Sequence, residues 1–224
     1  GVMGFTIRNL DNQDMGNPIS LLPQIKEFIA LAKQAEIPSV LGGTAFTTFP
    51  EAMLDFMEAD YGIAGQGEVG FPYLVESLET GKVDKEIPGL VWREADKIRC
   101  NPPRTTGYRG VQGDWGKLCI KGYRHSMMPA AVLVKTGCPY DCSYCDAYAT
   151  FGKRFHIREP EEIVEDIRQM RKDLRIASFF LVDPCLNAPL SHAKDILEAI
   201  VRADLGVLIS SILAPMHGEY DDEF

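Results

Sequence analysis

Three cysteines, Cys138, Cys142 and Cys145, form a CxxxCxxC pattern in the segment KTGCPYDCSYCDAY. Cysteine thiolates hold iron–sulfur clusters, and ferredoxin-type sites normally supply four of them to one cluster. Three thiolates occupy three corners of a four-iron cluster and leave one iron open to a ligand from outside the chain. The spacing therefore predicts a 4Fe-4S cluster with one corner available for chemistry.

A structural zinc site is the first alternative. Zinc takes four ligands, usually from paired CxxC spacings, so Cys185 or His156 would have to complete the tetrahedron. Unrelated buried thiols are a second alternative, but Gly137 and Pro139 are turn residues that place the first cysteine on a loop. This loop follows a predicted strand, and open α/β sheets bind ligands at the carboxyl ends of their strands.

Composition narrows the class of protein. The chain has 224 residues, with 23 basic and 32 acidic side chains and a net charge of −9, which disfavours non-specific binding to nucleic acid or anionic membranes. No apolar run approaches the ~20 residues that a bilayer span needs. Three clustered cysteines among six fit a metal site in a reducing cytoplasm better than a disulfide framework.

The pattern of elements predicts an α/β protein with two domains. Strand candidates alternate with helix candidates in both halves, which favours parallel sheets covered by helices. We expect an incomplete Rossmann-like domain over 1–85, a hairpin and linker over 86–128, and the first part of a barrel over 129–224. GVMGFTI, at the start, has the pattern of the middle of a strand, so we expect a chain cut at both ends and inactive alone.

The cysteine segment resembles the cluster loop of radical S-adenosylmethionine (SAM) enzymes, including the aromatic Tyr144 before the last cysteine. The resemblance implies that SAM chelates the open iron and is cleaved by one electron to a 5′-deoxyadenosyl radical. It continues in FGKRFHIREPEEIVEDI and SFFLVDPCLNAP, which are similar to the cobalamin-binding branch of that family. It implies SAM contacts for Tyr144, Asp183 and Asn187, whereas Cys185 is expected to be a buried thiol.

The amino-terminal half resembles the cobalamin-binding domain of the same branch, through LGGTAFTTFPEA and DYGIAGQGE. Glycine pairs let a backbone approach a bulky ligand closely, and each of these segments follows a predicted strand. The resemblance implies cobalamin contacts for Arg8, Asn9, Gly42, Gly43, Gly65, Gln66, Gly67 and Glu68. No DxHxxG motif occurs in the chain, so the axial ligand of cobalt stays open.

Other readings of these segments remain. GQGEVG matches GxGxxG, but a dinucleotide site needs it after the first strand of a βαβ unit, with an acidic residue ~20 positions on. Ordinary turn chemistry explains any one of the glycine pairs. Lys153, Arg154 and Arg158 either offset a negatively charged cluster or belong to a solvated loop before a helix.

The resemblance implies a cobalamin-dependent radical SAM methyltransferase that acts on an unactivated carbon of a small molecule or peptide. A flavodoxin or ferredoxin is expected to supply the electron, and neither nucleic acid nor membrane is an expected partner. The alternatives are a radical SAM enzyme without bound corrinoid and a zinc-stabilised binding or regulatory module.

Overall fold

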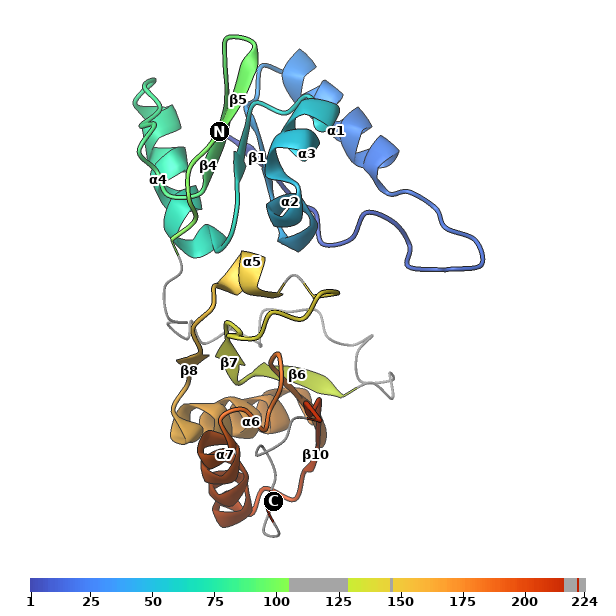
Figure 1. Ribbon diagram of the computed structural model, residues 1–224, viewed down its shortest axis with the longest axis vertical. Coiled ribbons are helices and arrows are strands. Elements are labelled where there is room, and N and C mark those ends of the chain that lie inside the picture. Colours follow the sequence, from blue (N-terminus) through green and yellow to red (C-terminus); the bar gives the residue numbers. More distant parts are fainter. Residues whose placement is uncertain (105–128, 146, 216–220, 222–224) are drawn as a thin grey trace. The chain divides into compact units, whose positions relative to one another are not determined.

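The computed structural model describes residues 1–104, 129–145, 147–215 and 221. The chain divides into two compact α/β units (Figure 1). The first unit comprises Gly1–Thr106 together with Pro139–Lys153, and the second comprises Gly107–Cys138 together with Arg154–Phe224. The predicted α/β class is confirmed, with a parallel three-stranded core in each unit.

A five-stranded sheet in the order β1-β2-β3-β4-β5 forms the first unit. Its strands are β1 (Met3–Thr6), β2 (Ser39–Gly42), β3 (Tyr61–Ile63), β4 (Leu90–Glu94) and β5 (Lys97–Cys100). The first three strands are parallel, whereas β4 is antiparallel to both of its neighbours. The hairpin that the sequence analysis grouped with the linker therefore extends the sheet of this unit.

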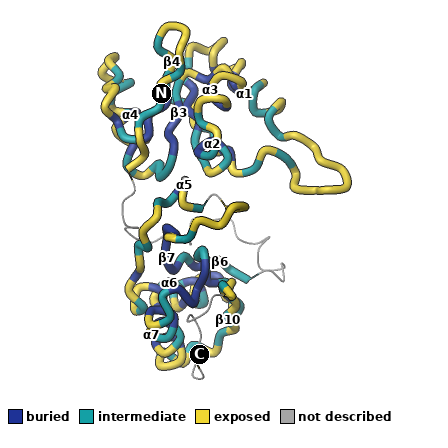
Figure 2. The backbone as a smooth tube through the Cα atoms, in the orientation of Figure 1, coloured by how far each residue is buried: buried dark blue, intermediate teal, exposed yellow. Residues whose placement is uncertain are grey.

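Helices cover both faces of this sheet. They are α1 (Leu22–Gln34), α2 (Thr44–Thr48), α3 (Pro50–Met57) and α4 (Gly67–Glu79). Successive residues of a strand point to opposite faces, so Leu41 packs with Ile29 of α1 and Leu54 of α3, whereas Val40 packs with Leu74 of α4. β2 and β3 form the buried centre of the unit in Figure 2.

Two features of the first unit depart from the sequence pattern. Phe28, predicted on the apolar stripe of α1, is 58% exposed, whereas Ile29 and Ala32 of the same stripe are buried. The short helix α2 was not predicted, and its Phe46 is fully buried in the core. A further short helix, α5 (Ala147–Phe151), follows the cysteine loop.

Three parallel strands in the order β10-β9-β6 form the second unit. The strands are β6 (Ala130–Leu133), β9 (Ser178–Val182) and β10 (Leu208–Ser211), and the connecting helices are α6 (Pro160–Leu174) and α7 (Leu190–Ala203). The resulting βαβαβ order agrees with the alternation of strands and helices predicted for this half of the chain. A separate antiparallel pair joins β7 (Lys135–Thr136) to β8 (His156–Ile157).

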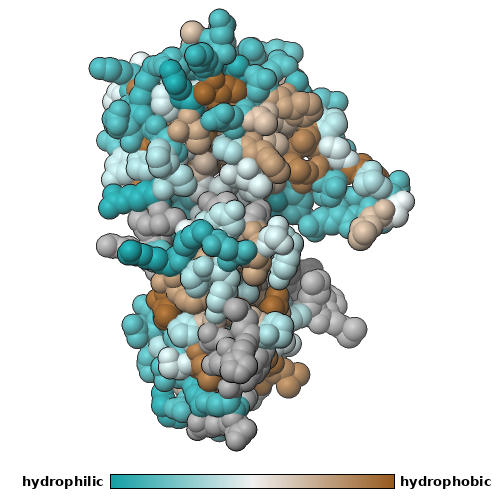
Figure 3. Space-filling view, in the orientation of Figure 1, coloured by the Kyte–Doolittle hydropathy of each residue, from teal (hydrophilic) through white to brown (hydrophobic). Residues whose placement is uncertain are grey.

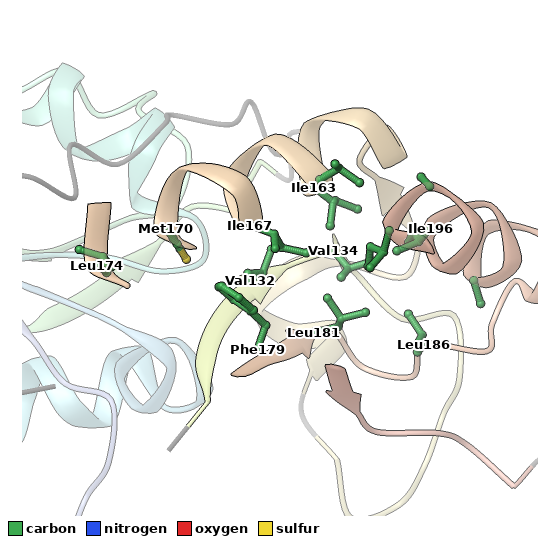
Figure 4. Packing of buried hydrophobic residues seen from close by; sticks show 14 residues of the cluster. Val132, Val134, Ile163, Ile167, Met170, Leu174, Phe179, Leu181, Leu186 and Ile196 are labelled. Atoms are coloured by element: carbon green, nitrogen blue, oxygen red, sulfur yellow. The ribbon is translucent and has the colours of Figure 1, made fainter. Parts of the chain in front are cut away.

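Both helices of the second unit pack on the sheet through one apolar cluster (Figure 4). An apolar stripe of α6 is buried against Val132, Phe179 and Leu181 of the sheet. It consists of Ile163, Ile167, Met170 and Leu174. Pro160 in the first turn of α6 and acidic residues beside it suit the positive end of the helix dipole.

No helix in the described part of the chain is long and apolar enough to cross a membrane. In Figure 3 hydrophobic residues appear at the surface among hydrophilic ones. On the first unit the exposed apolar side chains include Phe28, Leu31 and Phe56.

Gly62 yields a prediction about the first core. A Cβ at this position of β3 would lie 2.7 Å from Cε1 and 3.1 Å from Cε2 of the buried Phe46 ring. Gly62→Ala should therefore lower the free energy of unfolding by about 1–3 kcal/mol, the usual effect of overpacking. Gly67→Ala is the control, because no atom lies within 4 Å of its added Cβ. Equal urea midpoints for both variants would show that Phe46 does not pack as described.

Candidate functional site

The carboxyl ends of β1, β2 and β3 come together at one edge of the first sheet, because the three strands are parallel neighbours. The Ile7 amide donates to the Gly42 carbonyl at 2.7 Å, and the Ala45 amide donates to the Ile7 carbonyl at 3.1 Å. The Thr44 hydroxyl donates to the Arg8 carbonyl at 3.2 Å. The loop with Arg8 and Asn9 is thus tied directly to the glycine pair after β2.

Thr47 of α2 links the other two loops at this edge. Its hydroxyl donates to the Gly43 carbonyl at 2.9 Å and accepts from the Gly65 amide at 2.9 Å, and the residue is 8% exposed. The predicted cobalamin loops therefore form one connected surface. Thr47 was missed from sequence because a threonine after a glycine pair gives no sign of which backbone groups it will reach.

The glycines of this edge serve different purposes. A Cβ on Gly43 would lie 2.5 Å from the Ile7 carbonyl oxygen, and one on Gly65 would lie 2.6 Å from Cβ of Pro103. Both have positive φ angles, +97° and +83°, so the chain itself requires glycine there. An added Cβ at Gly42 has Ile63 O as its nearest neighbour at 3.8 Å, and one at Gly67 has none within 4 Å. A side chain at Gly42 would thus make only an ordinary van der Waals contact with the chain, and one at Gly67 would enter open space.

Gln66 and Glu68 lie at the start of α4. Gln66 is the N-cap residue, and Glu68 is an exposed acid in the first turn. The GxGxxG motif is completed by Gly70, whose added Cβ would lie 2.6 Å from the Pro88 carbonyl oxygen. Because the strand after α4 is antiparallel to β3, the motif does not open a parallel βαβ unit, and the context of a dinucleotide site is missing.

The cysteine loop leaves β7 through Gly137, which has a φ of +79°. Cys138 is buried, Cys142 and Cys145 are exposed, and all three thiols are free. Cys145 N donates to Cys142 O at 3.1 Å, which closes a tight turn. Free thiols on an accessible loop fit the donor chemistry of an iron–sulfur cluster. Among the described residues, no three His, Cys, Asp or Glu side chains form a metal-binding group.

Other side chains of this loop interact with one another. Tyr144 is 90% exposed, and its hydrogen bond with Cys142 raises the pKa of the phenol. Lys153 forms an ion pair with Asp141 and lies 5.2 Å from the centre of the Tyr148 ring. Lys153 is thus engaged at the loop, where it offsets an acidic side chain.

Arg158 lies within the protein and not on a solvated loop. It is 5% exposed, its Nη1 donates to Leu133 O at 2.7 Å, and the same atom pairs with Asp166 at 2.8 Å. Its own carbonyl accepts from His192 Nε2 at 2.9 Å. Because a carbonyl oxygen can only accept, Nε2 carries a proton, and burial lowers the pKa of His192. The contacts make Arg158 a structural residue of the second unit.

The two residues expected to contact SAM, Asp183 and Asn187, have inward-facing partners. Asn187 is 0% exposed and exchanges hydrogen bonds of 2.8 Å with the carbonyl and amide of Ala214. The Asp183 carboxylate is also fully buried and pairs with Lys135 Nζ at 2.9 Å. Cys185 is 2% exposed, the buried position expected of it. Lys135 was missed from sequence, although a lysine that ends the apolar run AAVLVK is unusual.

Comparison with known proteins identifies similar sequences and folds. Residues 132–224 match the radical SAM superfamily. The chain is 30% identical over 196 residues to the hopanoid C-3 methylase of Methylococcus capsulatus, a match that covers 82% of this chain and 36% of the relative.

Two further matches extend the comparison. The chain is 28% identical over 193 residues to the anaerobic magnesium-protoporphyrin IX monomethyl ester cyclase of Rubrivivax gelatinosus, covering 80% and 34% of the two chains. The radical SAM methyltransferase TsrM of Kitasatospora setae, solved with cobalamin and a [4Fe-4S] cluster, superposes with a TM-score of 0.75 at 24% identity. That match covers 90% of this chain and 40% of TsrM, so the two proteins share the fold over both units. The chain thus spans less than half the length of these relatives.

The bridging role of Thr47 is testable. Thr47→Val removes the hydroxyl, so the Gly43 carbonyl and the Gly65 amide each lose a hydrogen-bond partner. This loss should destabilise the protein by about 1–3 kcal/mol. Amide exchange at Gly65 should become faster as the loops separate. Thr48→Val is the control, because the Thr48 hydroxyl donates within its own helix at an exposed site, and a change of about 0.5 kcal/mol or less is expected. Unchanged exchange at Gly65 in Thr47→Val would contradict the bridge.

Proposed function

We propose that the complete protein is a cobalamin-dependent radical SAM enzyme that transfers a methyl group to an unactivated carbon. The CxxxCxxC loop, which follows β7 within the segment that matches the superfamily, is the observation that carries this proposal. The hopanoid C-3 methylase, named for a carbon methylation, favours methyl transfer over other radical chemistry.

Cys138, Cys142 and Cys145 would hold the cluster, which would supply a binding position for SAM and one-electron reducing chemistry. The loop is anchored at Lys135–Thr136 and by the ion pair of Lys153 with Asp141, so its ends are fixed while the exposed thiols are free to ligate. Tyr144, between two of the ligands, is accessible for a contact with SAM. In this scheme the chain binds and orients the cofactors, which carry the difficult steps.

Cobalamin would bind over the carboxyl edge of β1, β2 and β3. The absence of a backbone clash at Gly42 and the open space at Gly67 support this placement, and the exposed Arg8 with the neighbouring Asn9 lies at the same edge. Gly43, Gly65, Gln66 and Glu68 shape the loops around that space. An external flavodoxin or ferredoxin would donate the electron, and the substrate would be a small molecule or peptide.

The cluster assignment predicts the result of anaerobic reconstitution with iron and sulfide. The full-length protein should become brown, absorb near ~400 nm and hold about four irons, whereas zinc would give a colourless protein. Cys138→Ala, Cys142→Ala and Cys145→Ala should each lose most of the iron and all SAM cleavage. Cys100→Ala removes a thiol of β5 outside the loop and should retain both. Full iron content in any of the three loop variants would refute the ligand set.

The corrinoid assignment predicts selective effects at the open glycines. Gly42→Val and Gly67→Val should weaken cobalamin retention by the full-length protein at least about 10-fold, because a branched side chain would occupy the space of a bulky ligand. Their unfolding midpoints should change little, since the chain leaves room at both positions. Gly16→Val lies outside the edge and should bind as the wild type does. If the wild-type protein retains no cobalamin, the enzyme works without a corrinoid.

A further inference from the structure

Lys135 is a buried cation at the base of the cysteine loop. Its side chain is 0% exposed, it belongs to the short strand β7, and it precedes Cys138 by three positions. Its backbone is held by pairing with Ile157 of β8. A lysine is rarely buried completely unless its charge is paired. The groups around the ammonium of Lys135 therefore explain how this side chain can be buried.

Three groups from two other segments surround this ammonium. Its Nζ lies 2.9 Å from Asp183 Oδ2 and 3.1 Å from the Leu186 carbonyl oxygen, both in the loop after β9. The Phe155 ring, just before β8, has its centre 5.4 Å away. Lys135 thus ties the strand that leads into the cysteine loop to the loop between β9 and α7.

This buried ion pair is not expected to add much to the free energy of unfolding. Two buried charges lose their hydration, and well-packed apolar residues in their place are often as stable or more stable. Burial raises the pKa of Asp183, and the contact with Lys135 opposes that shift. His192 also lies near both residues: it too opposes the raised pKa of Asp183, and burial lowers the pKa of His192 itself. In the described residues no second cation lies within ion-pair distance of Asp183.

Direct contact of Asp183 with SAM does not fit this geometry. The carboxylate is fully buried, and its Oδ2 forms the ion pair with Lys135. Its Oδ1 is also buried and accepts no hydrogen bond from the described residues. To reach a ligand, the carboxylate would have to leave the lysine and strand it as an unpaired buried charge, which is strongly unfavourable. The pair is therefore suited to hold the loop and not to bind the cosubstrate.

We propose that Lys135 and Asp183 are an anchor pair that fixes the base of the cysteine loop, and that Asp183 acts on the cluster site through Lys135. Both are positioning residues. The anchor is a property of the chain without its cofactors, whereas its effect on a cluster rests on the proposed function.

Hydrogen exchange of the full-length apoprotein separates anchoring from general stability. In Lys135→Met and in Asp183→Asn, amides of the cysteine loop should exchange at least about 10-fold faster, since each variant breaks a buried pair. The double variant K135M/D183N no longer buries an unpaired charge, so its unfolding midpoint should recover toward the wild-type value. Its loop should still exchange fast, because the anchor is absent.

A second buried ion pair provides the matched control. The side chains of Asp166 and Arg158 are 15% and 4% exposed, and Asp166→Asn breaks the ion pair between them. This variant should lower the stability of the protein without faster amide hydrogen exchange in the cysteine loop. If Lys135→Met fails to fold, Lys135→Gln takes its place, because it removes the charge and retains an N–H donor. Wild-type loop exchange in K135M/D183N, or equally fast exchange in Asp166→Asn, would overturn the anchor.

The reconstituted protein gives an independent readout. The electron paramagnetic resonance spectrum of the reduced cluster, without SAM, should change in the same way in both single variants and the double variant, and not in Asp166→Asn. Asp183→Asn with a wild-type spectrum but a Kd for SAM raised about 10-fold would instead identify Asp183 as a ligand contact and overturn the proposal. If the wild-type protein assembles no cluster, the proposed function fails, and the exchange experiment alone decides the anchor.

Discussion

Parallel strand pairing is the constraint on which both units depend. When neighbouring strands run in the same direction, their carboxyl ends, and the loops that leave them, must lie at one edge of the sheet. In the first unit β1, β2 and β3 obey this constraint, and the loops at Arg8, Gly43 and Gly65 become close enough to share hydrogen bonds. In the second unit the same pairing of β6 with β9 brings Lys135 to Asp183.

Closeness of the loops limits which glycines are free for a ligand. Where backbones approach one another, as at Gly43 beside Ile7, a side chain would collide with the chain itself. At Gly42 an added Cβ would make only an ordinary contact with Ile63 O, and at Gly67 it would meet no atom within 4 Å. Packing of the chain thus explains the glycines at 43 and 65, whereas the glycines at 42 and 67 are the ones that the proposed cobalamin site would use.

The second unit holds the strand that leads into the cysteine loop with a buried ion pair, in contrast to its apolar core. Helices α6 and α7 are held by side chains such as Ile163, Ile196 and Leu181, whose burial is favourable in any arrangement that excludes water. An ion pair is directional and requires a particular partner. Such a contact is suited to fixing where a loop begins, as the proposed role of the three cysteines would require.

The sequence by itself determined the elements and the chemistry that depends on local spacing. The periodicity of α6, the βαβαβ order of the second half and the cysteine triplet followed from residue patterns, because helix faces and loop ligands are set by neighbours in the chain. Tertiary structure decided which polar side chains meet. Thr47 bridges two loops, and Lys135 captures Asp183 across 48 positions. No local pattern encodes such contacts, because they exist only after the strands have paired and water has been excluded from between them.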